Sequence, residues 1–355
     1  MVWLAVAALL TLSLLGVKTL YLFSANNGLF GHFEKCIGGW LTPSGKKLAP
    51  LTTNGRLGAV DWQIKAPAIF HLIFCEDYSH ADTTLAGLSF LGAWGPSWVV
   101  IVLESLRLYS QQRFLSYITI PGILIFNHSH AVMTPLYLAL RLAISPSVTP
   151  TGLAVHATHL KAIPWSFALG YILPIILMAL PSPQIVSPTF KHTAAGWYQQ
   201  WNVYIALIHW SLVFFWREDN RDLSSTETLE LTRNVYLFAI LCAGVAWWSA
   251  MWIALKKGGI PLALKAFVPA SPWSRKKAAS IYEGAKWLIQ WDGIIGTAAM
   301  TVWAISLLLD ANQSAPLPEN MWKKMLAYFI SGGPMAIPIG LLFERDKILL
   351  DYVNL

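Results

Sequence analysis

Apolar segments long enough to cross a bilayer recur along the whole chain, with shorter polar segments between them. A membrane-spanning helix needs about 20 predominantly apolar residues, so this pattern predicts an all-α, polytopic transmembrane bundle. We expect residues 1–355 to form a single transmembrane helical domain. The expected spans are 3–23, 60–75, 87–106, 115–140, 164–182, 197–216, 234–255, 287–309 and 325–343. Because 60–75 is short and carries polar residues, eight spans are an alternative to nine.

Several of these spans contain helix-breaking residues, and two stand out. Pro121 and Pro135 lie in the span 115–140, and the last span contains "SGGPMAIP", from Ser331 to Pro338. Proline removes a backbone donor and clashes with the preceding turn. We therefore expect kinked or broken helices at both places, with the freed backbone groups facing protein or a cavity.

The composition fits a membrane protein and excludes several other classes. Hydrophobic residues make up 55% of the chain and charged residues 12%, and the mean hydropathy is +0.51. The net charge of +7 comes from basic residues that lie mostly between spans, so they indicate topology rather than nucleic-acid binding. Cys36, Cys75 and Cys242 form no closely spaced pair, so neither a disulfide framework nor a zinc site is predicted.

The distribution of basic residues predicts the orientation. The first apolar segment has no basic segment before it and is long enough to span, which favours a retained helix over a cleaved signal. The loops after the first, third, fifth and seventh spans, together with the C-terminal tail, carry 16 Lys and Arg. The loops after the second, fourth, sixth and eighth spans carry 7. By the positive-inside rule, the N-terminus is luminal and the C-terminus is cytoplasmic. The sequon at Asn312 falls in a loop that this orientation makes luminal.

Three acids are expected at similar depth near the cytoplasmic side. Asp61 lies in "AVDWQIKAPAIF", Glu104 in "VVIVLESLRL" and Asp292 in "IQWDGIIG". Ionisable groups inside spans usually face a bundle interior or a wet cavity. For Asp61 and Glu104, an ordinary helix-end role is equally well supported, and Glu104 has Arg107 as an i,i+3 partner.

Histidines and tryptophans form the second part of the predicted site. His71, His128 and His209, with His130, are expected deeper in the bundle than the acids, by the helical rise of about 1.5 Å per residue. For His128 and His130, a hydrogen-bonded interior role is the alternative. The chain has 18 Trp, and the aromatic candidates for the pocket wall are Trp62, Trp291, Trp201 and Trp210. Aromatic faces stabilise cations.

Acids in an aromatic cavity suit acid-initiated carbocation chemistry. A carboxyl group in an apolar pocket stays protonated more readily than in water, and it can donate its proton to an epoxide or an alkene. We expect Asp292 to be this donor, with Glu104 and Asp61 as a second acid, a tuning partner or the terminal base. No metal or cofactor is expected. The acid-rich segment 218–222 stands alone, and the scattered histidines do not form the clusters that a di-iron site needs.

These residues resemble the fungal integral-membrane terpene cyclases of meroterpenoid pathways, especially the ascofuranone and ascochlorin cyclase group. The resemblance covers most of the chain and rests on its length, its Trp content and the three quoted acid segments. It implies a farnesylated or similar prenylated small-molecule substrate, often with a terminal epoxide. It also implies metal-free cyclisation in the endoplasmic reticulum membrane, with lipid as the surroundings. A proton-coupled transporter or lipid-binding membrane protein, and a sterol-type isomerase, are the alternatives.

Overall fold

A computed structural model describes residues 2–49, 53, 56–76, 78–108, 119–144, 148–217, 223–312 and 320–351. Within these ranges the chain forms helices joined by loops, and no β-strand occurs among the described residues. The acid-rich segment 218–222 and the end of the sequon, Ser314, lie outside the described residues.

Five helical segments in the described ranges are long and apolar enough to cross a membrane. The first is α1 (Val2–Gly16), which continues through a π-helical turn into α2 (Phe23–Asn27). The others are α5 (Ala81–Leu106), α9 (Ala157–Phe167) continuing into α10 (Leu173–Ala179), α13 (Ser225–Phe267) and α14 (Ile281–Ala311). The predicted all-α membrane bundle fits these helices, whereas the predicted count of eight or nine spans is not confirmed.

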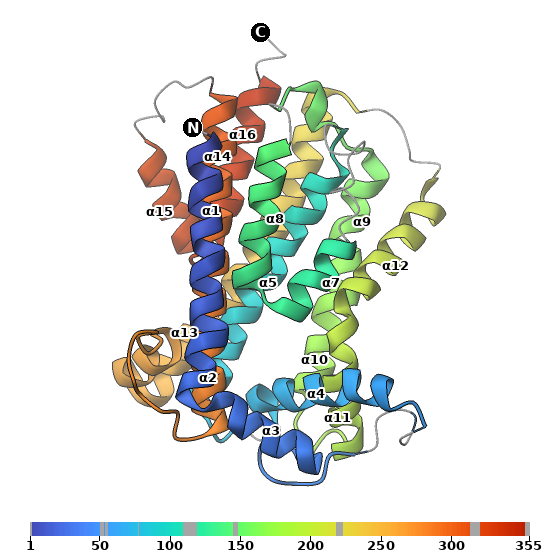
Figure 1. The fold of residues 1–355 in the computed structure, drawn as a ribbon. Coiled ribbons are helices and arrows are strands. Elements are labelled where there is room, and N and C mark those ends of the chain that lie inside the picture. Colours follow the sequence, from blue (N-terminus) through green and yellow to red (C-terminus); the bar gives the residue numbers. More distant parts are fainter. Residues whose placement is uncertain are drawn as a thin grey trace.

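Shorter helices close one end of the bundle. They are α3 (Leu29–Gly39), α4 (Gly58–Cys75) and α11 (Pro188–Trp197), and α12 (Trp201–Phe215) rises from the same end. In Figure 1, α4 lies across this end rather than along the long helices. The residues of the predicted span 60–75 therefore form a helix, but this helix does not run parallel to the others. Lys65 of this helix lies over the ring of Trp40.

The described part of the predicted span 115–140, residues 119–140, belongs to two helices that turn back on each other. They are α7 (Thr119–His128) and α8 (His130–Ile144), and Ser129 between them has a φ of 84°. Arg141 near the end of α8 donates to the Glu104 carbonyl at the end of α5, at 3.2 Å. The chain thus returns to the end of the bundle that it left after α5. The break lies at Ser129, whereas Pro135 is accommodated inside α8.

The break predicted in the last apolar segment is confirmed. Helix α15 (Met321–Gly332) ends before Gly333, which has a φ of 70°, and α16 (Ala336–Asp351) follows. Lys324 near the start of α15 bonds to Glu344 in α16 at 2.5 Å. The two helices therefore also run antiparallel.

Both ends of the described chain lie at the same end of the bundle. Figure 1 shows α1 beginning and α16 ending there, while α3, α4 and α11 lie at the opposite end. This arrangement does not fit the predicted luminal N-terminus and cytoplasmic C-terminus. The reason is that α4 lies across the bundle, and the α7–α8 and α15–α16 pairs each turn back, so these three segments do not contribute the crossings that the sequence pattern suggested.

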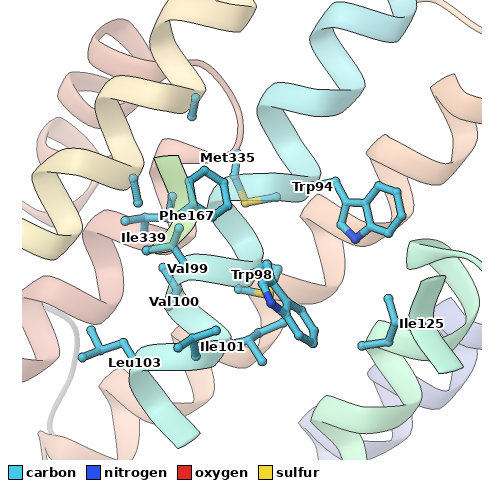
Figure 2. Close-up of a cluster of buried hydrophobic side chains, with 14 of the residues drawn as sticks. Trp94, Trp98, Val99, Val100, Ile101, Leu103, Ile125, Phe167, Met335 and Ile339 are labelled. Atoms are coloured by element: carbon cyan, nitrogen blue, oxygen red, sulfur yellow. The ribbon is translucent and has the colours of Figure 1, made fainter. Parts of the chain in front are cut away.

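Buried apolar residues form one large cluster that extends from Val6 to Leu350. Figure 2 shows part of it around α5, where Trp94 and Trp98 project toward Ile125 of α7. Gly122 allows this close approach, because an added Cβ would lie 2.6 Å from the Trp98 ring. The packing of α7 against α5 brings the α7–α8 junction beside the middle of the bundle.

Candidate active site

Asp292 lies in α14 opposite the start of α8, and its side chain is 6% exposed. Its Oδ1 accepts a hydrogen bond from the backbone N–H of Ala131 at 2.5 Å, and the Ser129 hydroxyl and the His130 N–H lie close to the same carboxyl group. The first N–H groups of a helix have no partner within that helix, and they favour a carboxylate nearby. The break at Ser129 therefore creates the binding place for the Asp292 side chain.

Asp292 lines a cavity of about 330 Å³, which we call the acid cavity. This volume falls in the range of about 300–1,000 Å³ that is typical of small-molecule sites. Residues of the π-helical turn after α1 (Val17–Leu22), of α3, α4 and α5, of the α7–α8 junction, of the segment before α12 and of α14 surround it. Three residues named from the sequence line it together with Asp292: Trp62, His71 and His128.

Aromatic rings form much of the cavity wall. Phe70 and Phe90 line it with Trp94, and the Phe90 and Trp94 ring centroids are 5.3 Å apart. Behind Trp94 lies Trp201, edge-on at 5.4 Å and only 1% exposed. Trp201 thus supports the wall from a second layer instead of lining the cavity. The faces of such rings attract a cation through their quadrupole.

His71 is held in one tautomer. Its Nδ1 lies 2.8 Å from the carbonyl oxygen of Ala195, and its ring packs edge-on against Tyr198 at 4.9 Å. A carbonyl oxygen can only accept, so Nδ1 must carry the hydrogen, and in a neutral imidazole Nε2 then has the free lone pair. His71 is therefore a candidate base in the cavity that contains Asp292.

Side-chain amides lie at another part of the cavity lining. Gln63 donates to the Asn127 side chain at 3.4 Å, and both residues line the cavity with Gln199. Tyr21 donates to the backbone carbonyl of His128 at 3.0 Å. These groups can hydrogen-bond a polar part of a ligand, whereas the aromatic wall suits its apolar part.

Glu104 does not reach the acid cavity. It lies ten residues beyond Trp94 on α5, which corresponds to about 15 Å along the helix. It is fully buried and bonds to Arg107 at 2.6 Å and to Arg345 at 2.7 Å. Arg107 bonds in turn to Asp346 at 2.5 Å. Glu104 thus belongs to a buried ion network that joins α5 to α16.

Asp61 also lies apart from Asp292. It is 4% exposed, and its carboxylate accepts from the backbone N–H and the hydroxyl of Thr53, at 2.9 and 3.0 Å. Its neighbour Trp62 lines the acid cavity, whereas Asp61 does not. The expected meeting of three acids in one chamber is therefore not what the structure contains.

The remaining predicted residues lie outside the cavity lining. The indole of Trp291 donates to the Ala270 carbonyl at 3.0 Å. His209 is 2.9 Å from the ring nitrogen of His159, and Trp210 is 59% exposed. His130, which was also predicted to lie deeper than the acids, is buried, and its Nδ1 lies 2.7 Å from the Thr134 hydroxyl.

Sequence reasoning missed several lining residues. Phe90 and Trp94 are spaced four apart and so share one helix face, which was a readable signal in α5. Ser129 gave no such signal, because a non-glycine residue with positive φ is uncommon. Tyr21 and Gln199 reach the cavity only through the packing of α1 and of the segment before α12.

The chain matches the family model described as the CtvD domain over residues 5–350. It is 27% identical to terpene cyclase ctvD of Aspergillus terreus over 96% of this chain and 98% of that protein. It is 24% identical to terpene cyclase atmA of Aspergillus flavus over 95% of each chain. With terpene cyclase ascI of Acremonium egyptiacum it shares 26% over 75% of this chain and 72% of that protein. No solved structure matches the chain. The chain therefore belongs to the CtvD domain family, and it is a terpene cyclase.

Proposed function

We propose that this cyclase starts its reaction by transferring the proton of Asp292 to a terminal epoxide or alkene of a prenylated substrate in the acid cavity. The observation that carries the proposal is the position of Asp292. It is a buried carboxyl group that lines a cavity with aromatic walls, and Ala131 fixes one of its oxygens. Glu104 and Asp61 are not part of the acid step, because neither lines this cavity.

With an epoxide, the reaction conserves all atoms. Asp292 gives its proton to the epoxide oxygen, and the C–O bond at the more substituted carbon breaks to leave a hydroxyl group and a carbocation. Internal double bonds then attack in turn, and each forms a ring C–C bond. Nε2 of His71 takes the final proton from carbon, which makes a new double bond. That proton returns to Asp292, so the product is an isomer of the substrate.

The cavity walls suit this sequence of cations. Phe70, Phe90 and Trp94 present rings to the space beside Asp292, and a desolvated cation over a ring gains about 2 kcal/mol or more. Apolar rings around the cation also keep water away from it and so prevent its early capture. The amides of Gln63, Asn127 and Gln199 suit the oxygenated aromatic part of a prenylated precursor. This placement leaves the prenyl chain along the rings.

We also propose a membrane location in the endoplasmic reticulum, with both chain ends in the lumen. The end of the bundle that holds α3 and α4 carries the basic segments 28–49 and 268–280. The N–H of Ala278 donates there to the Asn27 carbonyl at 2.9 Å. By the positive-inside rule this end faces the cytoplasm. The N-terminus keeps its predicted side, and the C-terminus changes sides.

The decisive variant is Asp292→Asn, tested in membranes supplied with an epoxidised farnesyl phenol. The amide oxygen can still accept from Ala131, but the amide cannot give a proton. We expect cyclisation to fall about 10²- to 10⁴-fold, the range that general acids contribute. The matched control is Asp310→Asn on the same helix, about 27 Å away by its rise, which should keep the wild-type rate. Wild-type cyclisation by folded Asp292→Asn would refute the proposal.

A further inference from the structure

A second cavity lies beside the acid cavity. It has a volume of about 500 Å³, and residues of α5, α13, α14 and the α15–α16 break line it. We call it the apolar chamber. Phe90 and Ile289 line both spaces, so these two side chains separate them. An added Cβ on Gly293 would lie 3.5 Å from the Phe90 ring, so α14 leaves room beside that ring.

The apolar chamber has a fixed hydrogen-bond acceptor. The Gln290 side chain is 7% exposed, and its Nε2 donates to the carbonyls of Lys265 and Ala266 at 3.0 and 2.7 Å. Both partners can only accept, so the amide cannot be flipped. Its Oε1 is buried and has no hydrogen-bond partner within the described part of the chain. A buried acceptor without a partner costs about 1–3 kcal/mol.

The same chamber also has a donor. Trp247 lines it, and its Nε1 is buried with no partner among the described residues. The ring is confined by Phe267, with centroids 4.8 Å apart, and by Gly333, where an added Cβ would lie 2.5 Å from the ring. The chamber thus combines apolar residues and the hydroxyl-bearing Ser89, Thr297 and Thr301 with two buried groups that have no partner among the described residues, the Gln290 acceptor and the Trp247 donor.

We propose that the apolar chamber is a product site that binds the terpene alcohol formed when the epoxide opens. A hydroxyl group donates to Gln290 and accepts from Trp247, whereas an epoxide or an ether can only accept. The chamber therefore selects the cyclised alcohol over its epoxide precursor and draws it away from Asp292. This inference rests on the proposed function, in its epoxide form, because only epoxide opening creates the hydroxyl group.

Binding can be measured without turnover. Purified protein is labelled with a diazirine analogue of farnesol, and the labelled peptides are located by mass spectrometry, with farnesol and farnesyl methyl ether as competitors. We expect label on α13 or α14 residues that line the chamber, and farnesol should compete about tenfold better than the ether. That ratio corresponds to about 1.4 kcal/mol, within the cost of one unpaired buried acceptor.

Three variants test the assignment of each group. Gln290→Met keeps the length of the side chain but removes the acceptor, so the tenfold preference should disappear. Trp247→Phe removes a donor that alcohol and ether use equally, so it should weaken both and leave their ratio unchanged. Ala298→Phe fills the chamber, so it should abolish labelling there. The Trp247 and Ala298 variants keep the proposal testable if Gln290→Met does not fold.

Several outcomes would overturn the product site. Equal competition by alcohol and ether would remove the hydroxyl recognition, and labelling that survives Ala298→Phe would place the ligand elsewhere. Tighter competition by ergosterol than by farnesol would assign the chamber to a membrane sterol instead. The Asp292→Asn variant separates the two proposals. If it cyclised the substrate at the wild-type rate, the proposed role of Asp292 would fail, but the preference of the chamber for farnesol over the ether would still stand.

Discussion

The carboxylate of Asp292 accepts a 2.5 Å hydrogen bond from the backbone N–H of Ala131, although 161 positions separate the two residues along the chain. Ala131 is in the first turn of α8, two residues after Ser129 with its positive φ. The contact fixes the acid against a helix start, while aromatic rings form much of the wall of the cavity that the acid lines. Three of our predictions concern this contact and the wall around it.

Two replacements of Ser129 distinguish the effect of its hydroxyl from the effect of its backbone conformation. Ser129→Gly and Ser129→Ala both remove the hydroxyl that lies close to Asp292. We expect each to lower cyclisation per folded molecule about tenfold, the worth of one charge-assisted bond from this hydroxyl to the carboxylate that proton transfer leaves. Alanine additionally pays about 1–2 kcal/mol for the left-handed conformation, whereas glycine does not. Thermal unfolding should therefore rank alanine below glycine. A wild-type rate in Ser129→Gly would show that the hydroxyl does not act on Asp292.

Crowding the contact from the α14 side should also weaken it. An added Cβ on Gly296 would lie 1.9 Å from the His130 ring, so Gly296→Ala must push α8 away from α14. We expect a loss of about 1–3 kcal/mol in stability, typical of overpacking, together with reduced cyclisation. Gly293→Ala on the same helix is the control, since its nearest contact would be 3.5 Å. Equal stability of the two variants would contradict the packing argument.

Trp94 should influence which products form. Trp94→Leu removes a ring from the cavity wall, so we expect cyclisation to slow about 30-fold, equivalent to about 2 kcal/mol of cation stabilisation. Products that stop after fewer ring closures should increase, as measured by mass spectrometry. Trp98→Leu removes an equally buried ring that does not line the acid cavity. If both variants give the same product pattern, the cation does not contact Trp94.

Glu104 should affect folding rather than chemistry. Glu104→Gln leaves Arg107 and Arg345 with less negative charge around them, and breaking a buried ion pair costs about 3–5 kcal/mol. We expect little folded protein in detergent, but a normal rate for each folded molecule. Glu344→Gln, which breaks a partly exposed pair with Lys324, should cost only about 1 kcal/mol or less. A fully folded but inactive Glu104→Gln protein would return Glu104 to the reaction.

The positions of the chain ends can be tested with tags. An N-glycosylation sequence fused to the N-terminus or to the C-terminus should be modified in both cases, because the proposed orientation puts both termini in the lumen. A third tag inserted in segment 268–280 should remain unmodified. Modification at one terminus only would restore the orientation in which the ends lie on opposite sides of the membrane.

The sequence alone was sufficient for the class of fold and for four residues of the candidate site, Asp292, Trp62, His71 and His128. Length, hydropathy and span spacing predicted a helical membrane bundle, because satisfying backbone groups in lipid leaves few other structures. The break at "SGGPMAIP" followed from Gly and Pro. Asp292 stood out because an isolated acid in a long apolar helix is costly unless it faces a protein interior.

The tertiary structure decided which residues share a cavity. Similar depth along separate helices gave no information on the direction of each side chain. Glu104 belongs to a buried ion network, and Asp61 accepts hydrogen bonds from Thr53. Helix α4 lies across the bundle although its composition allowed a span. Ser129 breaks the helix, although the prolines were the visible signal. In each case the outcome depended on contacts between segments distant in sequence, which local hydropathy does not encode.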